Sequence, residues 1–438
     1  MEIDKTTLTD LSIFNTEEEF SVFAKFNFCK TVGGKEQLLA NFSKPLSSID
    51  EIKGIQQTLQ VILQNQSHWP TQISNGSIMV IEKFYLSTID DIPANPSQLS
   101  AYNYKLLHGP DFSLVKYSTA HIFDFIKGMQ LIVHHFLKDD TPVPLKKLLL
   151  QIQQSINKEQ FIVVEKNNKA EDLTTPQQLH LAHFVRYHYK QNILELINIY
   201  SKLDAWYGMA SAMEHYKLVF PEFVELSQPL ISAKQLYHIL LPQPVAYDIT
   251  LSPESNFMFL TGANMAGKST FIKSVGTAVF LAHAGMGVPA QQMQLSLFDG
   301  LLSNINVTDN IAKGESYFYN EVQRIKATIT KINDGRKWLI LIDELFKGTN
   351  VQDAMKCSST VIEGLLKIKN SLFILSTHLY EIGDSLKQYP NISFNYFETT
   401  VINDQLHFSY QLKEGISNDR FGYLILRTEG VIDILQKL

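Results

Sequence analysis

The chain has 438 residues, which is too long for one ordinary core and suits two domains. Hydrophobic residues form 45% of the sequence and charged residues 19%, a balance that excludes a disordered chain and indicates a globular one. The formal net charge of −6 excludes a chain that is basic overall and argues against strong intrinsic affinity for DNA, so any contact with DNA must come from local lysine patches or from a dimeric groove.

The sequence also predicts a cytoplasmic protein without a membrane segment. No stretch approaches the roughly 18 uninterrupted apolar residues that span a bilayer, and the N-terminal sequence M-E-I-D-K-T-T is unlike a targeting peptide. Cys29 and Cys357 lie in different halves of the chain without metal-ligand spacing. Neither a disulfide framework nor a zinc site is therefore expected.

Residues 1–240 are predicted to form a mainly α-helical domain, because apolar residues recur at intervals of three and four. The clearest segment runs from about residue 176 to residue 216 and carries an apolar stripe along about ten turns or more. Such a helix suits either a lever that spans the domain or a plain core helix, and the pattern leaves both open. Residues 88–113 are richer in turn formers, and their structure is left open.

From about Leu241 the pattern changes to short apolar runs that alternate with helical segments, which predicts an α/β domain over residues 241–438. Three of the runs are typical of buried parallel strands, at residues 256–261, 337–342 and 371–376. Polar residues follow each run. Because open α/β sheets bind ligands at the carboxyl ends of their strands, these polar residues are the candidate site.

The strongest motif is G-A-N-M-A-G-K-S-T at residues 262–270, which matches the phosphate-binding (P-loop) pattern G-x-x-x-x-G-K-[ST]. It follows a predicted strand and precedes a helical run, as such a loop requires. Backbone N–H groups and the helix N-terminus would point at a β-phosphate, Lys268 would contact the β- and γ-phosphates, and Ser269 would bind Mg²⁺. The predicted nucleotide-binding residues of the loop are Gly262, Ala263, Asn264, Met265, Ala266, Gly267, Lys268, Ser269 and Thr270.

Acidic residues end the second of the three strands. In L-I-L-I-D-E, Asp343 would organise Mg²⁺ and its waters, and Glu344 would orient or deprotonate the attacking water. A solvated pair of acids is the alternative, which the preceding phosphate loop disfavours. His378 follows the third strand and could reach the γ-phosphate or that water, although a lone histidine is more often an ordinary surface or core residue. Lys268, Glu344 and His378 are thus the predicted catalytic residues.

One further stretch, D-N-I-A-K-G-E-S-Y-F at residues 309–318, stays undecided on spacing alone. Its serine, Ser316, lies beside a glycine and ahead of a helical segment. It could help to bind a phosphate through backbone N–H groups, or it could be an ordinary helix cap.

At these motifs the C-terminal half resembles the ATPase domain of the MutS family of DNA mismatch repair proteins, which belongs with the ABC-type ATPases. The resemblance runs from about Val245 to the end, through the phosphate loop, V-P-A at 288–290, D-E-L-F-K-G-T-N at 343–350 and S-T-H-L-Y-E-I at 376–382. It implies an ATPase that uses ATP and Mg²⁺. It also implies a homodimer in which Ser316 of one subunit approaches the γ-phosphate bound by the other.

The resemblance further implies an aromatic contact to adenine. The late aromatic position of the family matches Tyr410, whereas the early one falls near Pro244, which lacks a ring, so Tyr247 is a candidate substitute. Ala263 and Ala266 stand where the family usually has proline and glycine. The loop therefore departs from the family pattern at two positions that are not part of the phosphate-loop consensus itself.

The N-terminal half resembles, more weakly, the helical core and lever region of MutS, through residues 31–52 and 202–210. Nothing ahead of residue 31 resembles the family's mismatch-reading domain or its connector domain. Residues 158–174 are short for its clamp domain. We therefore expect these domains to be absent, and mismatch recognition is not carried over.

The leading hypothesis is a MutS-like ATPase in which ATP binding joins two subunits and acts as a conformational switch, with DNA as the expected partner in mismatch repair or a related process. The competing hypothesis is an ATP-controlled scaffold that binds a protein partner and has no direct DNA role. The negative net charge and the expected absence of a reader domain favour the second. The salt dependence of DNA binding distinguishes the two.

Overall fold

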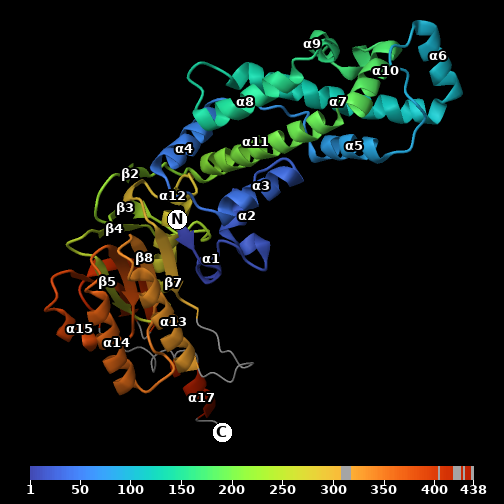
Figure 1. The fold of residues 1–438 in the computed structure, drawn as a ribbon. Helices are drawn as coiled ribbons and strands as arrows, with labels where there is room; N and C mark the ends of the chain where they lie inside the picture. Colours follow the sequence, from blue (N-terminus) through green and yellow to red (C-terminus); the bar gives the residue numbers. More distant parts are fainter. Residues whose placement is uncertain (307–316, 403–404, 418–425, 428–429, 436–438) are drawn as a thin grey trace. The chain divides into compact units, whose positions relative to one another are not determined.

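The computed structural model describes residues 1–306, 317–402, 405–417, 426–427 and 430–435, and Figure 1 shows its fold. The chain divides into two compact units, neither of which is continuous in sequence. The sheet unit contains Met1–Lys25, Lys44–Ile52 and Tyr216–Leu438, and the helical unit contains Phe26–Ser43 and Lys53–His215. The domain boundary between residues 240 and 241 remains a prediction. Among the helices of the described residues, none is long and apolar enough to cross a membrane.

The helical unit confirms that the N-terminal region is mainly α-helical. Its helices are α3 (Val32–Ser43), α5 (Asn75–Leu86), α6 (Gln98–Leu107), α7 (Gly109–Phe136), α8 (Val143–Ile156), α9 (Ile162–Lys166), α10 (Thr175–His183) and α11 (Lys190–Tyr216). Helix α4 (Ile49–Gln64) begins in the sheet unit and continues in this one. Residues 88–113, whose structure the sequence left open, contain a stretch without helix or strand at 88–97, then α6 and the start of α7.

The single helix predicted at about residues 176–216 is interrupted. Helix α10 passes into a π-helical stretch at Phe184–His188, and α11 follows it. Within this stretch the Arg186 guanidinium donates hydrogen bonds to the carbonyl oxygens of Phe84 and, at 2.6 Å, Ser87 at the end of α5. Carbonyl groups at a helix end lack backbone N–H partners in their own helix, so the π-helical stretch brings Arg186 to acceptors that α5 does not use for its own backbone hydrogen bonds.

A buried carboxylate joins α11 to the start of α3. Asp204 is fully buried and accepts hydrogen bonds from the backbone N–H groups of Lys30 at 2.9 Å and Thr31 at 2.8 Å, and from the Thr31 hydroxyl at 2.7 Å. Burial raises the pKa of Asp204, and these hydrogen bonds oppose the rise. Packing is tightest at Gly34, where a Cβ atom would lie 2.1 Å from Asp204 Oδ2. Asp204 therefore stabilises the N-terminal end of α3 through both charge and hydrogen bonding.

The sheet unit confirms a mixed α/β structure for the C-terminal region. Its main sheet has the order β1-β7-β8-β9-β5-β10-β11, with β1 (Glu2–Ile3), β7 (Gly300–Asn304), β8 (Trp338–Asp343), β9 (Ser371–Ser376), β5 (Phe257–Gly262), β10 (Ile392–Ile402) and β11 (Gln405–Glu414). Neighbouring strands are parallel except for the antiparallel pair β10 and β11. A smaller sheet has the order β2-β6-β3-β4, with β2 (Glu222–Val224), β6 (Gln292–Ser296), β3 (Ile231–Leu236) and β4 (Tyr247–Leu251).

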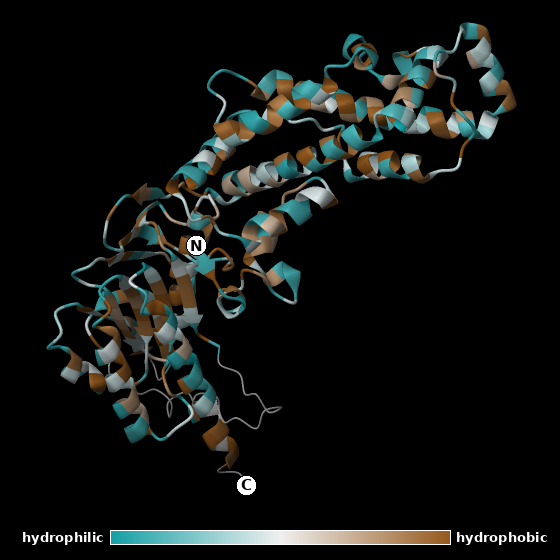
Figure 2. Ribbon diagram, in the orientation of Figure 1, coloured by the Kyte–Doolittle hydropathy of each residue, from teal (hydrophilic) through white to brown (hydrophobic). Residues whose placement is uncertain are grey.

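The three strands predicted from apolar runs are the central strands β5, β8 and β9, and every residue in them is buried. They lie in the hydrophobic part of the sheet in Figure 2. The helices of this unit include α12 (Lys268–His283), α13 (Tyr317–Ile332), α14 (Val351–Leu365), α15 (Ile382–Leu386) and α17 (Val431–Leu435). Ile325 of α13 and Ile362 of α14 pack into a core cluster with Phe257 and Trp338. Because β5, β8 and β9 are parallel neighbours, their carboxyl ends lie at one edge of the sheet.

The first residues of the chain extend this sheet. Strand β1 pairs in parallel with β7, with Glu2 opposite Gly300. Helix α1 (Lys5–Asp10) follows, and its buried Asp10 accepts hydrogen bonds from the Ser303 hydroxyl at 2.6 Å and from Arg324 at 3.2 Å. A two-residue strand has no periodic pattern, so the sequence did not indicate it.

Candidate functional site

A tight loop joins the buried strand β5 to helix α12. Gly262 (φ 139°) and Gly267 (φ 109°) have backbone conformations that residues with side chains rarely adopt. At Gly262 a Cβ atom would also come within 3.1 Å of the Phe397 carbonyl oxygen. The two glycines thus let the chain turn sharply from the strand into the N-terminus of α12, where free N–H groups and the helix dipole favour an anion.

Lys268 begins α12 and is only 5% exposed. Its Nζ donates hydrogen bonds to the carbonyl oxygens of Gly262 at 2.9 Å and Ala263 at 3.0 Å, and it lies 3.4 Å from Nε2 of His378. Burial lowers the pKa of Lys268, while the carboxylates of Glu344 and Asp343 act in the opposite direction. The loop therefore holds the ammonium group through backbone carbonyls that a bound anion can replace.

Asp343 ends strand β8 and is 7% exposed. Its Oδ2 accepts a hydrogen bond of 2.5 Å from the Ser269 hydroxyl, and its Oδ1 accepts one from the Ser376 hydroxyl at the end of β9. The strand register places Asp343 directly opposite Ser376. Carboxylate and hydroxyl oxygens are the kind of ligand that Mg²⁺ prefers, so Ser269 and Asp343 fit a magnesium site.

Glu344 follows Asp343 with a φ of 61°, a conformation that costs energy in a residue with a Cβ atom. Its carboxylate pairs with Nε2 of His378 at 2.8 Å and with Nζ of Lys347 at 3.0 Å. Burial by itself raises the pKa of Glu344, but His378 and then Lys347 outweigh burial and hold the pKa at about 2. At neutral pH Glu344 is therefore an anion that two nitrogen donors hold in place.

Sequence reasoning missed two residues of this cluster, Ser376 and Lys347. Ser376 could have been found by pairing the ends of the two predicted strands, since both strands end at the same sheet edge. Lys347 lies three residues after Glu344, and the contact depends on the loop conformation, because Phe346 also has a left-handed φ of 60°. That conformation has no signal in the sequence.

A cavity of about 460 Å³ opens beside the loop, within the range of about 300–1,000 Å³ that is usual for small-molecule sites. Its lining residues are Leu241, Gln243, Val245, Tyr247, Asn264, Met265, Gly267, Lys268, Ser269, Thr270, Glu344 and Tyr410. A larger cavity, of about 990 Å³, lies in the helical unit. Among the described residues, its lining places the acidic Glu165 beside Lys127 and includes no glycine, so this cavity is the weaker candidate for an anionic ligand.

Two tyrosines line the smaller cavity in different ways. Tyr410 is 40% exposed, and its ring lies 3.5 Å from where a Cβ atom on Gly267 would be. Tyr247 is 5% exposed, and its ring packs edge-on against Phe271 and Phe397 at centroid distances of 5.4 and 5.6 Å. The ring of Tyr410 is therefore partly exposed beside the loop, whereas the ring of Tyr247 is packed in the core.

The structure brings five predicted residues together where β5, β8 and β9 end: Lys268, Ser269, Asp343, Glu344 and His378. Tyr410 lines the adjoining cavity together with four of the other loop residues predicted to bind nucleotide, which are Asn264, Met265, Gly267 and Thr270. Ser316 lies outside the described residues. The fold and the site thus define an α/β domain with a glycine-bounded loop, at the N-terminus of α12, on the carboxyl edge of its sheet.

Comparison with known proteins identifies the C-terminal part more closely, because residues 258–436 match the family model of MutS domain V. The DNA mismatch repair protein MutS of Petrotoga mobilis is 27% identical over 297 residues, which are 66% of this chain and 35% of that protein. MutS protein homolog 4 of Homo sapiens is 29% identical over 239 residues, 52% of this chain and 25% of that protein. The MutS of Thermotoga maritima is 27% identical over 249 residues, 56% of this chain and 31% of that protein.

The C-terminal part of the chain is therefore homologous to MutS domain V, which confirms the resemblance seen in its motifs. The matched segments are about a quarter to a third of the length of these relatives. The activity and the partners of the whole relatives consequently do not pass to this chain by homology alone.

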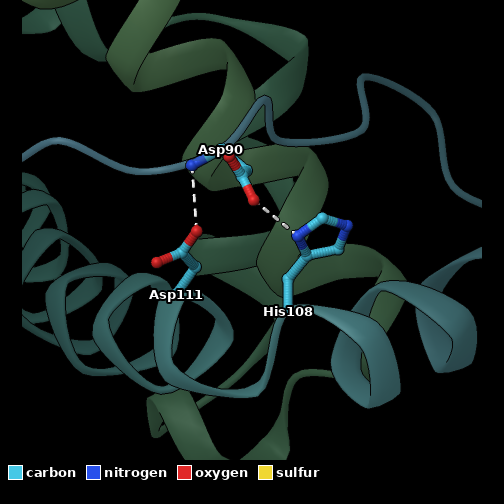
Figure 3. A group of neighbouring side chains, drawn as sticks. All are labelled: Asp90, His108 and Asp111. Carbon is cyan, nitrogen blue, oxygen red and sulfur yellow. Dashed lines mark hydrogen bonds and ion pairs between the residues drawn. The ribbon is translucent and has the colours of Figure 1, made fainter.

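Figure 3 shows a second polar group, formed by Asp90, His108 and Asp111 in the helical unit, whose potential metal-ligand atoms lie within 4.8 Å of one another. Nδ1 of His108 lies 2.7 Å from Oδ2 of Asp90, and the Asp90 backbone N–H donates to Asp111 at 2.9 Å. The side chains of His108 and Asp90 are 37% and 66% exposed. These pairings link the segment before α6 to the junction of α6 and α7 and explain the cluster without an ion, so we assign no metal to it.

Proposed function

We propose that the chain is a Mg²⁺-dependent ATPase of the MutS type, with Gly262–Thr270 as its P-loop. The observation that carries the proposal is the meeting of four side chains at this loop: Ser269 with Asp343 at 2.5 Å, and Glu344 with His378 at 2.8 Å. In a solvated pair of acids at a strand end, Asp343 and Glu344 would instead be hydrogen-bonded to water. The match of residues 258–436 to MutS domain V supports the same chemistry.

Each residue has a defined role in this proposal. Lys268 and the N-terminus of α12 bind the phosphates, and Tyr410 offers its ring to adenine in the adjoining cavity. Ser269 and Asp343 would hold Mg²⁺, which supplies charge stabilisation at the phosphate oxygens. His378 lies between Lys268 and Glu344 and so can sense whether a γ-phosphate is present.

The low pKa of Glu344 favours one of its two proposed roles, which is to orient the attacking water rather than to deprotonate it. A general base works best when its pKa lies near the working pH, and a carboxylate with a pKa of about 2 is a weak base. Glu344 therefore acts mainly by orienting the attacking water, unless the γ-phosphate draws Lys347 or His378 away and raises its basicity. Either way, replacing Glu344 removes the carboxylate that holds the water but leaves the phosphate-binding groups in place.

The ATP-bound form is proposed to be a homodimer that serves as a conformational switch. Ser316 of one subunit would contact the γ-phosphate that the other subunit binds, so that ATP closes the dimer and hydrolysis reopens it. Two of the relatives are DNA mismatch repair proteins, which makes DNA the proposed partner in that process or a related one. The negative net charge favours the alternative of an ATP-controlled protein scaffold.

The ATPase proposal is tested with Glu344→Gln, which keeps the size of the side chain but removes its charge. We expect this variant to bind ATP and to accumulate as an ATP-bound dimer in analytical ultracentrifugation, with turnover reduced by about 100-fold or more. Turnover at the wild-type rate would contradict the role of Glu344. The exposed Glu363→Gln on α14 is the matched control, because the chemical change is the same.

The shared site is tested by mixing two inactive variants, Lys268→Ala and Ser316→Ala. A mixed dimer contains one composite site in which both groups are intact, so activity should return on mixing. No recovery, despite demonstrated subunit exchange, would contradict the action of Ser316 across the dimer.

The DNA partner is tested by salt titration with duplex, mismatched and branched DNA. Binding should weaken with a log–log slope of about −0.9 per phosphate neutralised. The absence of binding to all three DNAs with ATP present would favour the scaffold.

A further inference from the structure

Helix α13 buries a glutamate on the face that otherwise packs into the core. The buried residues of α13 are Glu321, Ile325, Thr328 and Ile332, which recur at intervals of three and four along one face. Glu321 is 4% exposed, and a buried carboxylate is unfavourable unless polar groups compensate it. Burial raises the pKa of Glu321, while backbone N–H groups act in the opposite direction. Its role must therefore come from the groups that it binds.

The partners of Glu321 lie in the loop that follows Glu344. Oε1 of Glu321 accepts a hydrogen bond from the backbone N–H of Lys347, and Oε2 accepts one from the backbone N–H of Gly348, each at 3.3 Å. Both carboxylate oxygens thus bind consecutive backbone groups, which fixes the path of the main chain. The side chain of Lys347 in turn pairs with Glu344 at 3.0 Å.

The loop needs this support because its backbone is strained. Glu344 and Phe346 have φ angles of 61° and 60°, conformations that persist only where the surrounding structure holds them. A second residue of α13 contacts the same loop, since the rings of Phe318 and Phe346 lie 5.7 Å apart. Helix α13 therefore holds the loop at two points, one polar and one aromatic.

We infer that Glu321 is a positioning residue for ATP hydrolysis: its carboxylate holds the backbone of Lys347 and Gly348 and so keeps Glu344 against His378 beside the P-loop. The inference rests on the proposed ATPase function and deepens it. Without the carboxylate, two N–H groups lose their acceptors and the left-handed residues can relax. Glu344 then moves away from its water-orienting position, and a displacement of about 1 Å costs on the order of 100-fold in rate.

The test begins with Glu321→Gln. This change keeps the shape of the side chain but replaces one acceptor oxygen with an NH₂ group that faces an N–H donor. We expect kcat for ATP to fall by about 10- to 100-fold, while KM and the Kd for Mg-ATP stay within about threefold, because the P-loop itself is unchanged. Glu363→Gln, the same change on the exposed face of α14, should keep wild-type values.

A double-mutant cycle separates positioning from general stabilisation. In the Glu344→Gln background, Glu321→Gln should change single-turnover hydrolysis by less than about twofold, because its effect acts through Glu344. Equal rate losses in both backgrounds would overturn the inference. If far-ultraviolet circular dichroism shows that Glu321→Gln does not fold, Glu321→Asp takes its place in the same cycle, since aspartate keeps both acceptors but withdraws them by one methylene group.

ATP hydrolysis by the wild-type protein distinguishes a failure of the proposed ATPase function from a failure of the positioning role of Glu321. Wild-type protein that hydrolyses no ATP contradicts the proposed function itself. Wild-type hydrolysis together with an unaffected Glu321→Gln contradicts only the positioning role.

Discussion

Replacing His283 with glutamine should make the sheet unit less sensitive to acid. His283 ends α12 and is fully buried, with Nδ1 3.0 Å from the Leu46 carbonyl oxygen and Nε2 accepting the Phe298 backbone N–H at 3.3 Å. These partners require a neutral ring with its proton on Nδ1, because the carbonyl can only accept and the N–H can only donate. Burial lowers the pKa of His283 from 6.5 to about 3.

The direction of the effect follows from proton uptake. Unfolded chains protonate this histidine below pH 6.5, whereas the folded chain resists protonation down to about pH 3, so stability falls as the pH falls through this window. Above pH 6.5 the contribution is fully present. Between these two pKa values the free energy of unfolding falls by up to about 1.4 kcal/mol per pH unit, which amounts to about 2 kcal/mol between pH 7 and pH 5.

Glutamine can donate to Leu46 and accept from Phe298 without titrating. Between pH 7 and pH 5 the free energy of unfolding of His283→Gln should therefore fall by about 2 kcal/mol less than that of wild type. Hydrogen exchange of the amides in β5 and β8, followed by mass spectrometry, gives the opening free energy of the sheet unit at each pH. His238, whose pKa burial lowers to about 4, titrates in both proteins and cancels from the comparison. If the opening free energy changed equally with pH in wild type and in His283→Gln, the assigned role of His283 would be refuted.

Three further predictions concern single side chains. Asp204→Ala should destabilise the helical unit by about 3 kcal/mol in urea unfolding, because buried donors lose a charged acceptor, and a loss under about 1 kcal/mol would show that water replaces it. Ser376→Ala should weaken Mg²⁺ binding by about tenfold in calorimetry with ATP present, since Asp343 loses a hydrogen-bond partner, and unchanged affinity would argue against Asp343 as a ligand. Tyr410→Ala should raise the Kd for ATP by about tenfold and leave the Kd for inorganic triphosphate unchanged, because only the adenine contact is lost. Tyr247→Phe should change neither Kd, and an effect on ATP binding as large as that of Tyr410→Ala would contradict the assignment.

The sequence predicted the parts of the fold that depend on local patterns. Strands β5, β8 and β9 are buried apolar runs, and their parallel order puts Lys268, Asp343 and His378 at one edge of the sheet, so this part of the site follows from motif and topology together. The helical character of the N-terminal region follows from apolar periodicity in the same way.

Other features depend on contacts between distant residues and could not be predicted. The π-helical stretch at Phe184–His188 places Arg186 against the end of α5, and a continuous helical pattern does not reveal it. Strand β1 is too short to have a period. Glu321 looks like a break in the apolar face of α13, and only the loop that it binds shows why a glutamate is there.

Hydrolysis of ATP by the purified chain tests the central claim most directly. A single-turnover assay with radiolabelled ATP should show release of γ-phosphate that requires Mg²⁺, stops with excess chelator, and is lost in Lys268→Ala. One ATP bound per chain at saturation is expected. Wild-type protein that neither binds ATP nor releases phosphate in the presence of Mg²⁺ would contradict the account.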